Sequence, residues 1–391
     1  MFSTTKPAIS PKQSPEPSGL LTGAVALLVV FIASLSVQAQ TYTVLHQFKG
    51  PDGASPYGSL ILRNGSLYGM TRDGGAHGNG TVFKLTNTTE KLLYSFSGAP
   101  DGAHPLRDLS RDSAGNLYGA TALGGTSGGG TVFKLDAKKN ETVLYSFTGG
   151  ADGEQPQSGL LRDSAGNLYG TTVLGGDANY GTVFKIDTTG TQTVLHSFGG
   201  DADGEFPYSG VIQDAAGNLY GTTGGDGISS LGTVFKVDSS GQETVLYSFK
   251  GGADGEQPMG GVIRDSAGNL YGTTYLGGSG SGTVFKLDKN GNESVLYSFA
   301  GSADGANPLG GLVRDKAGTL FGTTENGGAE NVGTVFEVDK ANRQTVLHSF
   351  SKSGGDGKYP ETGLVQDAQG NLYGATYLGG TGKGIVFELT P

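Results

Sequence analysis

Asn167-Leu-Tyr-Gly-Thr-Thr172 contains a tripeptide, Leu-Tyr-Gly, that recurs along the chain and indicates its fold. Leu-Tyr-Gly, written once as Leu-Phe-Gly, occurs seven times at intervals of 50 to 52 residues. The copies begin at Leu67, Leu117, Leu168, Leu219, Leu270, Leu320 and Leu372. A fixed period of this length indicates repeated units that are too small to bury their own faces and stack on neighbours.

Each unit contains four short segments rich in Val, Leu, Phe, Tyr and Thr, separated by clusters of Gly, Asp, Asn and Ser. In the third unit they are residues 159–163, 167–172, 181–187 and 193–198. Such segments predict strands, and the turns between them predict antiparallel hairpins. Four antiparallel strands repeated radially predict an all-β fold, a seven-bladed β-propeller of four-stranded blades.

The frame of the repeat predicts how the ring closes. The chain opens on a segment of the fourth type, residues 42–48, and ends on one of the third type, residues 384–389. If segments such as 159–163 are innermost, residues 42–48 complete the outer edge of the last blade. Closure of this kind removes the open sheet edges that a linear array would expose. We therefore predict a single propeller domain over residues 41–391.

Residues 1–40 form a separate segment. An uncharged apolar run, residues 20–37, follows a polar start with two lysines, and Val37-Gln38-Ala39 offers a small-residue cleavage site. This layout predicts a secretory signal peptide, with an uncleaved membrane anchor as the alternative. We expect a protein that is secreted or held in the cell envelope, in contact with a membrane only if this segment is retained.

Composition excludes several classes of function. The net charge of −10 argues against nucleic-acid binding, which requires a basic surface. The absence of cysteine excludes disulfides and thiolate metal sites. Glycine, at 72 residues, recurs at fixed places in the unit and indicates turns.

The ordered segments Gly-Asn-Leu-Tyr-Gly-Thr-Thr, Gly-Thr-Val-Phe-Lys and Thr-Val-Leu-Tyr-Ser-Phe resemble the GloVer tandem repeat, of Gloeobacter/Verrucomicrobium type, over residues 41–391. The strand order also resembles, more loosely, that of NHL-type propellers. The resemblance implies an exported bacterial protein and supplies no defined activity.

One face of the predicted ring carries a repeated Asp-Gly. The aspartates, which we take as ligand-face candidates, are Asp52, Asp101, Asp152, Asp203, Asp254, Asp304 and Asp356. A ring of carboxylates could hold Ca²⁺ or a polar, sugar-like ligand. The alternative, which we favour, is turn chemistry repeated with the blade. Three histidines, His46, His196 and His348, stand where other units have tyrosine, which indicates packing or a sheet hydrogen bond rather than a metal site.

The unit repeats least well in its first two copies. Met70-Thr-Arg-Asp73 departs from the repeat, and Arg107-Asp108 replaces the usual small residues. Because one blade must differ to carry chemistry, His104, Arg107 and Asp108 are the further candidates for a ligand face.

The sequence favours a monomeric binding or scaffold module for an unidentified extracellular ligand, polysaccharide or protein. It nominates no catalytic residue, no metal ligand and no cofactor. Two alternatives stay open: an extracellular enzyme acting on a carbohydrate or polymer, with its site on the Asp-Gly face, and a Ca²⁺-stabilised structural protein.

Overall fold

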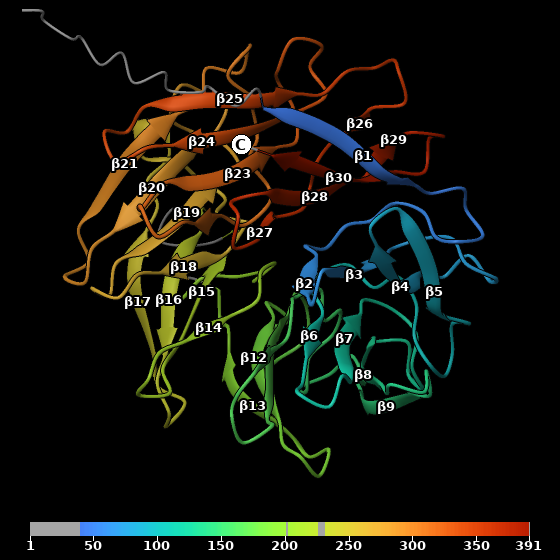
Figure 1. Cartoon of the computed structure of the whole chain (residues 1–391). Helices are drawn as coiled ribbons and strands as arrows, with labels where there is room; N and C mark the ends of the chain where they lie inside the picture. The colour runs from blue at the N-terminus through green and yellow to red at the C-terminus, as the bar shows by residue number, and fades with distance from the viewer. Residues whose placement is uncertain (1–39, 201, 226–230, 391) are drawn as a thin grey trace, which may run out of the picture. The chain divides into compact units, whose positions relative to one another are not determined.

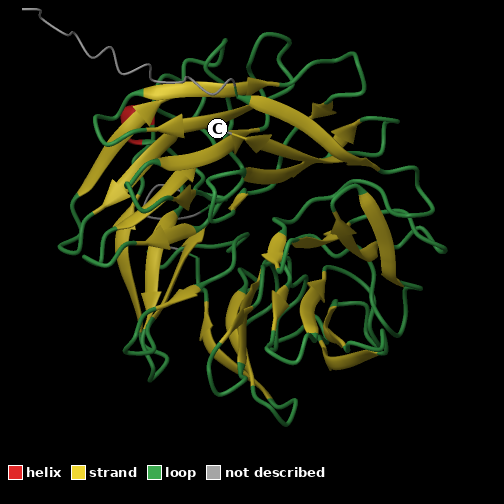
Figure 2. Ribbon diagram, in the orientation of Figure 1, coloured by secondary structure: helices red, strands yellow, loops and turns green. Residues whose placement is uncertain are grey.

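The computed structural model of the chain describes residues 40–200, 202–225 and 231–390. These residues belong to one compact unit that is built almost entirely of strands (Figure 2). The predicted signal segment lies outside the described residues. Among the described residues, no helix has both the length and the apolar character needed to cross a bilayer.

Seven four-stranded sheets are arranged in a ring, and each occupies one blade (Figure 1). The innermost strands are β2 (Ile61–Arg63), β6 (Ser110–Arg111), β10 (Leu161–Arg162), β14 (Ile212–Gln213), β18 (Val262–Arg264), β22 (Val313–Arg314) and β27 (Val365–Gln366). The second strands are β3 (Ser66–Thr71), β7 (Leu117–Thr121), β11 (Leu168–Thr172), β15 (Leu219–Thr223), β19 (Leu270–Thr274), β23 (Leu320–Thr324) and β28 (Leu372–Thr376).

The third strands are β4 (Thr81–Thr86), β8 (Thr131–Leu135), β12 (Thr182–Ile186), β16 (Thr233–Val237), β20 (Thr283–Leu287), β24 (Thr334–Val338) and β30 (Ile385–Thr390). The outer strands are β5 (Thr89–Ser95), β9 (Glu141–Ser146), β13 (Gln192–Ser197), β17 (Glu243–Ser248), β21 (Glu293–Ser298), β25 (Gln344–Ser349) and β1 (Thr41–Gln47). A short pair, β26 (Gly357–Lys358) with β29 (Leu378–Gly379), and one 3₁₀ turn, η1 (Gly252–Asp254), complete the described elements.

The first strand of the chain closes the ring. β1 pairs antiparallel with β30, in register from Thr41 opposite Thr390 to Gln47 opposite Ile385, and the sheet order is β1-β30-β28-β27. The predicted propeller, its blade composition and its closure by the N-terminal strand are therefore confirmed.

The glycine of each Leu-Tyr-Gly makes room for an aromatic ring. Gly170 pairs directly across the sheet with Phe184, and a Cβ on Gly170 would lie 2.8 Å from Cζ of that ring. The equivalent approach in all seven blades is 2.5–2.8 Å. This separation is shorter than real carbon–carbon contacts, so the sheet requires glycine at this position for steric reasons.

The same phenylalanine ring joins its blade to the preceding one. Phe184 meets Phe147, which ends the outer strand of the preceding blade, edge to face at 5.1 Å. All seven seams carry this contact, with centroids 5.0–5.4 Å apart and interplanar angles of 65–72°. Both rings are fully buried in every seam. Edge-to-face aromatic pairs are each worth about 0.5–1.5 kcal/mol beyond their burial.

Residues at the start of the outer strands form a second contact at the seams, and in four blades the residue there is an ionisable glutamate. In two blades a glutamine at the start of the outer strand donates to the main-chain oxygen of the preceding blade's aspartate, as Gln192 does to Asp152. Glutamate takes this position in four blades, and each has one buried oxygen without a hydrogen-bond partner among the described residues. These residues are Glu90, Glu141, Glu243 and Glu293. Burial, reinforced by the preceding blade's aspartate, raises the pKa of each to about 7.

We predict that Gly170→Ala destabilises the propeller by about 1–3 kcal/mol, because the added methyl group forces Phe184 out of its place in the seam. Urea unfolding measures the loss. Gly150→Ala is the matched control, because only Thr148 Oγ1, at 3.6 Å, approaches its Cβ position. Equal losses in the two variants would contradict the steric argument.

We predict that the thermal midpoint falls as the pH rises from 5 to 8. The seam glutamates bind protons more tightly in the folded state, at a pKa of about 7, than in the unfolded chain at about 4.5. Stability is therefore lost across that window and stays low above it. Glu141→Gln should raise the midpoint at pH 8 but not at pH 5, because glutamine donates without titrating. Asp177→Asn, which removes an exposed charge, is the control, and the same pH effect in both variants would refute the assignment.

Candidate functional site

The seven Asp-Gly aspartates are tied to their own outer strands. Each accepts a hydrogen bond from the tyrosine or histidine six to eight residues before it, at 2.6–3.2 Å. Each also accepts a main-chain N–H from the residue that follows the outer-strand phenylalanine. In each blade, this carboxylate thus fixes the loop that follows the outer strand to that strand.

This anchor explains why tyrosine and histidine interchange. His196 Nε2 contacts Asp203 at 3.2 Å in the way that Tyr145 contacts Asp152 at 2.9 Å. A β-bulge in every outer strand shifts the alternation of its side chains just before this residue. Burial lowers the pKa of His196, so the neutral ring predominates at neutral pH. Among the described residues, no group of three or more His, Asp or Glu side chains is placed to hold a metal ion.

The loops after the second strand and before the innermost strand meet on one face. Main-chain bridges join them within each blade, as between Glu154 and Leu174. The residue before each loop proline also donates its N–H to the preceding blade, at 2.7–2.9 Å, and its carbonyl accepts from the residue after the second strand, at 2.9–3.1 Å. This residue is therefore fixed between two blades.

Each of these seven residues has a left-handed backbone although none is glycine. They are Ser55, His104, Gln155, Phe206, Gln257, Asn307 and Tyr359, with φ between 54° and 58°. Such a conformation costs a side-chain-bearing residue about 1–2 kcal/mol, and glycine would avoid the cost. In a chain with 72 glycines, the use of six kinds of side chain at these seven positions indicates that the side chains are needed on this face.

Two further positions on the same face differ from blade to blade. The residues after the second strand are Arg72, Ala122, Val173, Gly224, Tyr275, Glu325 and Tyr377. The residues after the loop proline are Tyr57, Leu106, Gln157, Tyr208, Met259, Leu309 and Glu361. We call this surface, together with the left-handed residues, the variable face.

The Glu and Arg residues of the variable face, Glu325, Glu361 and Arg72, lie on blades 6, 7 and 1, and its aromatic side chains lie on blades 4, 5, 7 and 1. Arg72 Nη1 donates to Tyr377 Oη at 3.1 Å, and the Tyr377 ring meets the Tyr57 ring edge to face at 6.1 Å. The guanidinium of Arg107 lies 5.5 Å from the centroid of Tyr57. Tyr275 Oη donates to Glu325 Oε2 at 3.0 Å. These contacts build one contiguous cluster from residues that lie up to 305 positions apart in the sequence.

Glu361 is the most perturbed carboxyl group of this cluster. Burial, reinforced by the Glu325 carboxylate, raises the pKa of Glu361 to about 7, against a hydrogen bond from Tyr57 and the charges of Arg107 and Arg72. Burial also raises the pKa of Tyr57 to about 12, so its hydroxyl remains a donor. A carboxyl group that titrates near neutral pH beside a second carboxylate and two arginines is typical of functional sites.

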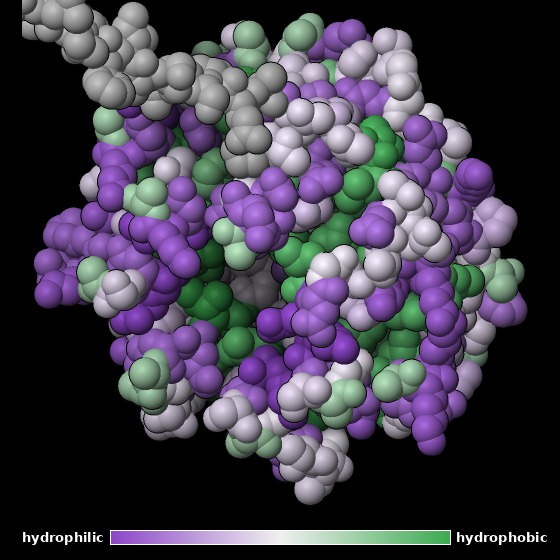
Figure 3. Space-filling model, in the orientation of Figure 1, coloured by the Kyte–Doolittle hydropathy of each residue, from purple (hydrophilic) through white to green (hydrophobic). Residues whose placement is uncertain are grey.

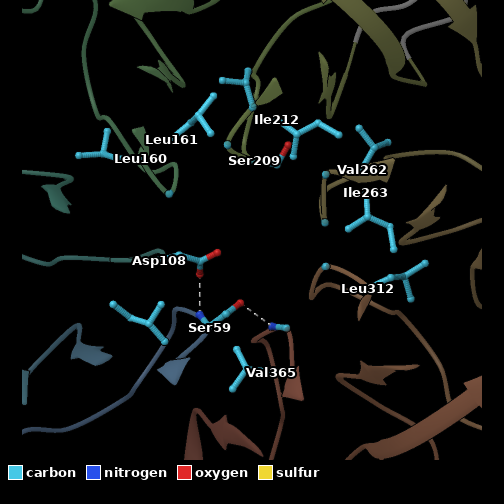
Figure 4. Close-up of a pocket in the computed structure, with 18 of the residues that line it drawn as sticks. Ser59, Asp108, Leu160, Leu161, Ser209, Ile212, Val262, Ile263, Leu312 and Val365 are labelled. Carbon is cyan, nitrogen blue, oxygen red and sulfur yellow. Dashed lines mark hydrogen bonds between the residues drawn. The ribbon is translucent and has the colours of Figure 1, made fainter. Parts of the chain in front are cut away.

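The three further candidates, His104, Arg107 and Asp108, lie in two different places. His104 Nδ1 contacts the Arg72 carbonyl oxygen at 3.1 Å and Asp73 Oδ1 at 3.2 Å, and Arg107 covers Tyr57. Asp108 instead turns to the channel, where its Oδ1 accepts the Ser59 N–H at 2.6 Å (Figure 4).

The channel itself is narrow and largely apolar. A cavity of about 380 Å³ is lined by residues of all seven blades, including Ile61, Leu161, Ile212 and Ile263 of the innermost strands. A hollow with apolar residues beside it is visible at the centre of Figure 3. Asp108 is the one charged residue among those that line the cavity.

The repeat pattern did not single out Tyr57, Tyr275, Glu325, Glu361 and Tyr377. A signal for them was present, because each occupies one of two positions that vary between otherwise similar units. What the sequence does not show is that these positions meet at one arc of the ring.

Fold and site together define a seven-bladed propeller with one asymmetric, polar arc on its variable face. Solved structures of similar fold include two extracellular domains from B. thetaiotaomicron. One, described as part of a hybrid two-component system, is 11% identical with a TM-score of 0.62 over 90% of this chain and 39% of that chain. The other, described as part of a one-component system, is 15% identical with a TM-score of 0.57 over 90% and 42%.

A protein from Bacteroides fragilis NCTC 9343, described as a 6-phosphogluconolactonase, is 16% identical with a TM-score of 0.50 over 80% of this chain and 87% of that one. At these identities the likeness shows the fold alone, and this chain spans about two fifths of the two extracellular proteins. No curated protein matches the chain.

The model of the Gloeobacter/Verrucomicrobia repeat matches residues 29–235 and 208–391. The chain belongs to this family, as the resemblance in its repeat segments predicted.

We predict that Gln257→Gly stabilises the propeller by about 0.5–1 kcal/mol, because glycine adopts the left-handed backbone without the steric cost. Urea unfolding measures the gain. Gln257→Ala removes the same side chain while keeping the cost, so it should bring no gain. Equal stability of the two variants would contradict the argument that strain is held at this position.

Proposed function

We propose that this protein is an exported binding module that holds an extracellular saccharide on its variable face. The observation that carries the proposal is the set of seven left-handed residues, which keep their side chains at a cost to stability. Architecture alone would place glycine at these positions, as it does at many other turns of this chain.

The chemistry of the asymmetric arc supports a saccharide. Tyr57, Tyr275 and Tyr377 offer rigid aromatic surface with hydroxyl donors, and Glu325 and Glu361 offer acceptors. Binding sites for small molecules and sugars combine such aromatic walls with a few convergent polar groups.

Export is supported from two sides. The N-terminal sequence has the layout of a signal peptide. Two solved structures with this fold are extracellular domains.

We predict that the purified protein binds a subset of an array of plant, algal and microbial polysaccharides. Tyr57→Ala should weaken that binding at least tenfold, because Tyr57 connects both arginines to Glu361. Tyr220→Ala is the control, because this half-buried tyrosine bonds Asp214 in the hairpin turn at the other end of its blade. Affinity unchanged by Tyr57→Ala would contradict the proposed face, and silence across the array would favour a protein ligand.

A second candidate is hydrolysis of a glycosidic bond on the same arc. The observation that favours it is the raised pKa of Glu361, about 7, beside the Glu325 carboxylate, since glycosidases separate the acidities of two carboxyl groups. Release of reducing ends from a bound polysaccharide would establish it. Glu361→Gln should then abolish release while binding persists.

A further inference from the structure

Arg72 and Arg107 are the arginines that belong to the polar cluster of the variable face. Like every described arginine except Arg343, neither has a carboxylate within 4.0 Å among the residues that the structure describes. Both are half-buried, and one sits on blade 1 while the other precedes the innermost strand of blade 2. Tyr377 takes one donor of Arg72, and Arg107 lies over the face of Tyr57. Each guanidinium has five donors, so most of this capacity is not used by an ion pair.

The remaining arginines have structural uses or lie in turns. Four stack on the second-strand tyrosine of the preceding blade at 5.4–5.6 Å, namely Arg111, Arg162, Arg264 and Arg314. Arg343 is paired with Asp339 at 2.6 Å. Arg63 is exposed at the hairpin turn of blade 1.

We propose that Arg72 and Arg107 bind an oxyanion on the saccharide, the carboxylate of a uronic acid or a sulfate ester. The proposal rests on the proposed binding function and names the class of its ligand. The planar donor fork of arginine matches such oxyanions and binds them through paired hydrogen bonds. The tyrosines that connect the two arginines would lie against the sugar ring.

The overall charge makes this pair selective. A chain of net charge −10 repels an acidic polymer at long range, so an acidic ligand needs a local cationic site. Arg72 and Arg107 supply that site on the face that also carries the carboxyl groups of Glu325 and Glu361.

Glu361 couples this site to pH. The groups that act on it are Glu325, Tyr57, Arg107 and Arg72, and its own charge acts on Tyr275. The His104–Asp73 pair lies next to Arg72. When Glu361 is protonated, both arginines lose a nearby negative charge, and an anion should bind more tightly. Affinity for an acidic saccharide should therefore rise as the pH falls from 8 to 6.

Three forms of one polymer test the proposal: dextran, carboxymethyl dextran and dextran sulfate. We expect titration calorimetry on the full chain to show at least tenfold tighter binding of one anionic form than of dextran. The form that binds identifies the carboxylate or the sulfate as the oxyanion. Arg72→Gln and Arg107→Gln should each cost about tenfold in affinity, and Arg63→Gln, the exposed control, should cost nothing.

Glu361→Gln keeps the size of the side chain and removes its titration. Its affinity at pH 8 should match that of the unmodified protein at pH 6, a result that a merely structural role would not produce. Thermal melts establish that each variant is folded before it is titrated.

Two outcomes overturn the inference in different ways. If a neutral saccharide binds and Tyr57→Ala abolishes it while both arginine variants bind normally, the anion assignment is wrong and the binding function stands. If no saccharide binds, neutral or charged, both proposals fail. Equal losses in Arg63→Gln and Arg107→Gln would show a general charge effect and also refute the assignment.

Discussion

The contact between a glycine and a phenylalanine ring, repeated in every blade, is the constraint on which the propeller depends. The glycine of Leu-Tyr-Gly has no side chain, so the phenylalanine opposite it in the next strand folds over the backbone. The same ring then meets the phenylalanine that ends the preceding blade. The space left by the glycine within one sheet therefore determines how neighbouring sheets pack. The contact recurs seven times, including the seam where Phe48, from the start of the chain, meets Phe83.

Around this contact the other repeated residues have assigned roles. In five blades the second-strand tyrosine donates a hydrogen bond to the turn aspartate of its own hairpin. In four blades, three of them among these five, the next blade's arginine stacks on this tyrosine. The paired threonines, such as Thr172 and Thr182, bond each other at 2.8 Å inside the sheet. The Asp-Gly aspartate holds the outgoing loop to the outer strand. A residue type that recurs in seven blades with the same partner is explained by architecture.

The fold could be predicted from the sequence because the same four-segment unit recurs seven times. The chain starts with a segment of the fourth type and ends with one of the third type, which also predicted how the ring closes. The role of the Asp-Gly ring could be proposed but not assigned, since its partner stands seven residues earlier across a β-bulge. Of the candidates chosen from the sequence, His104 and Arg107 lie at the asymmetric arc, and Asp108 lies at the channel. Arg72 and Tyr377 are 305 residues apart and meet only because the ring closes, which no local pattern reveals.

The placement of the asymmetric arc has a physical reason. A symmetric face would offer a ligand seven equivalent orientations, and none would be preferred. Charges placed on one arc leave a single orientation in which Arg72, Arg107 and Glu361 act together. The left-handed residues make such specialisation possible, because main-chain bonds to both neighbouring blades fix their backbone whatever side chain they carry. Side chains on this face can therefore change from blade to blade while the glycine–phenylalanine seams stay the same, and this separation of roles lets a repeat protein carry one specific site.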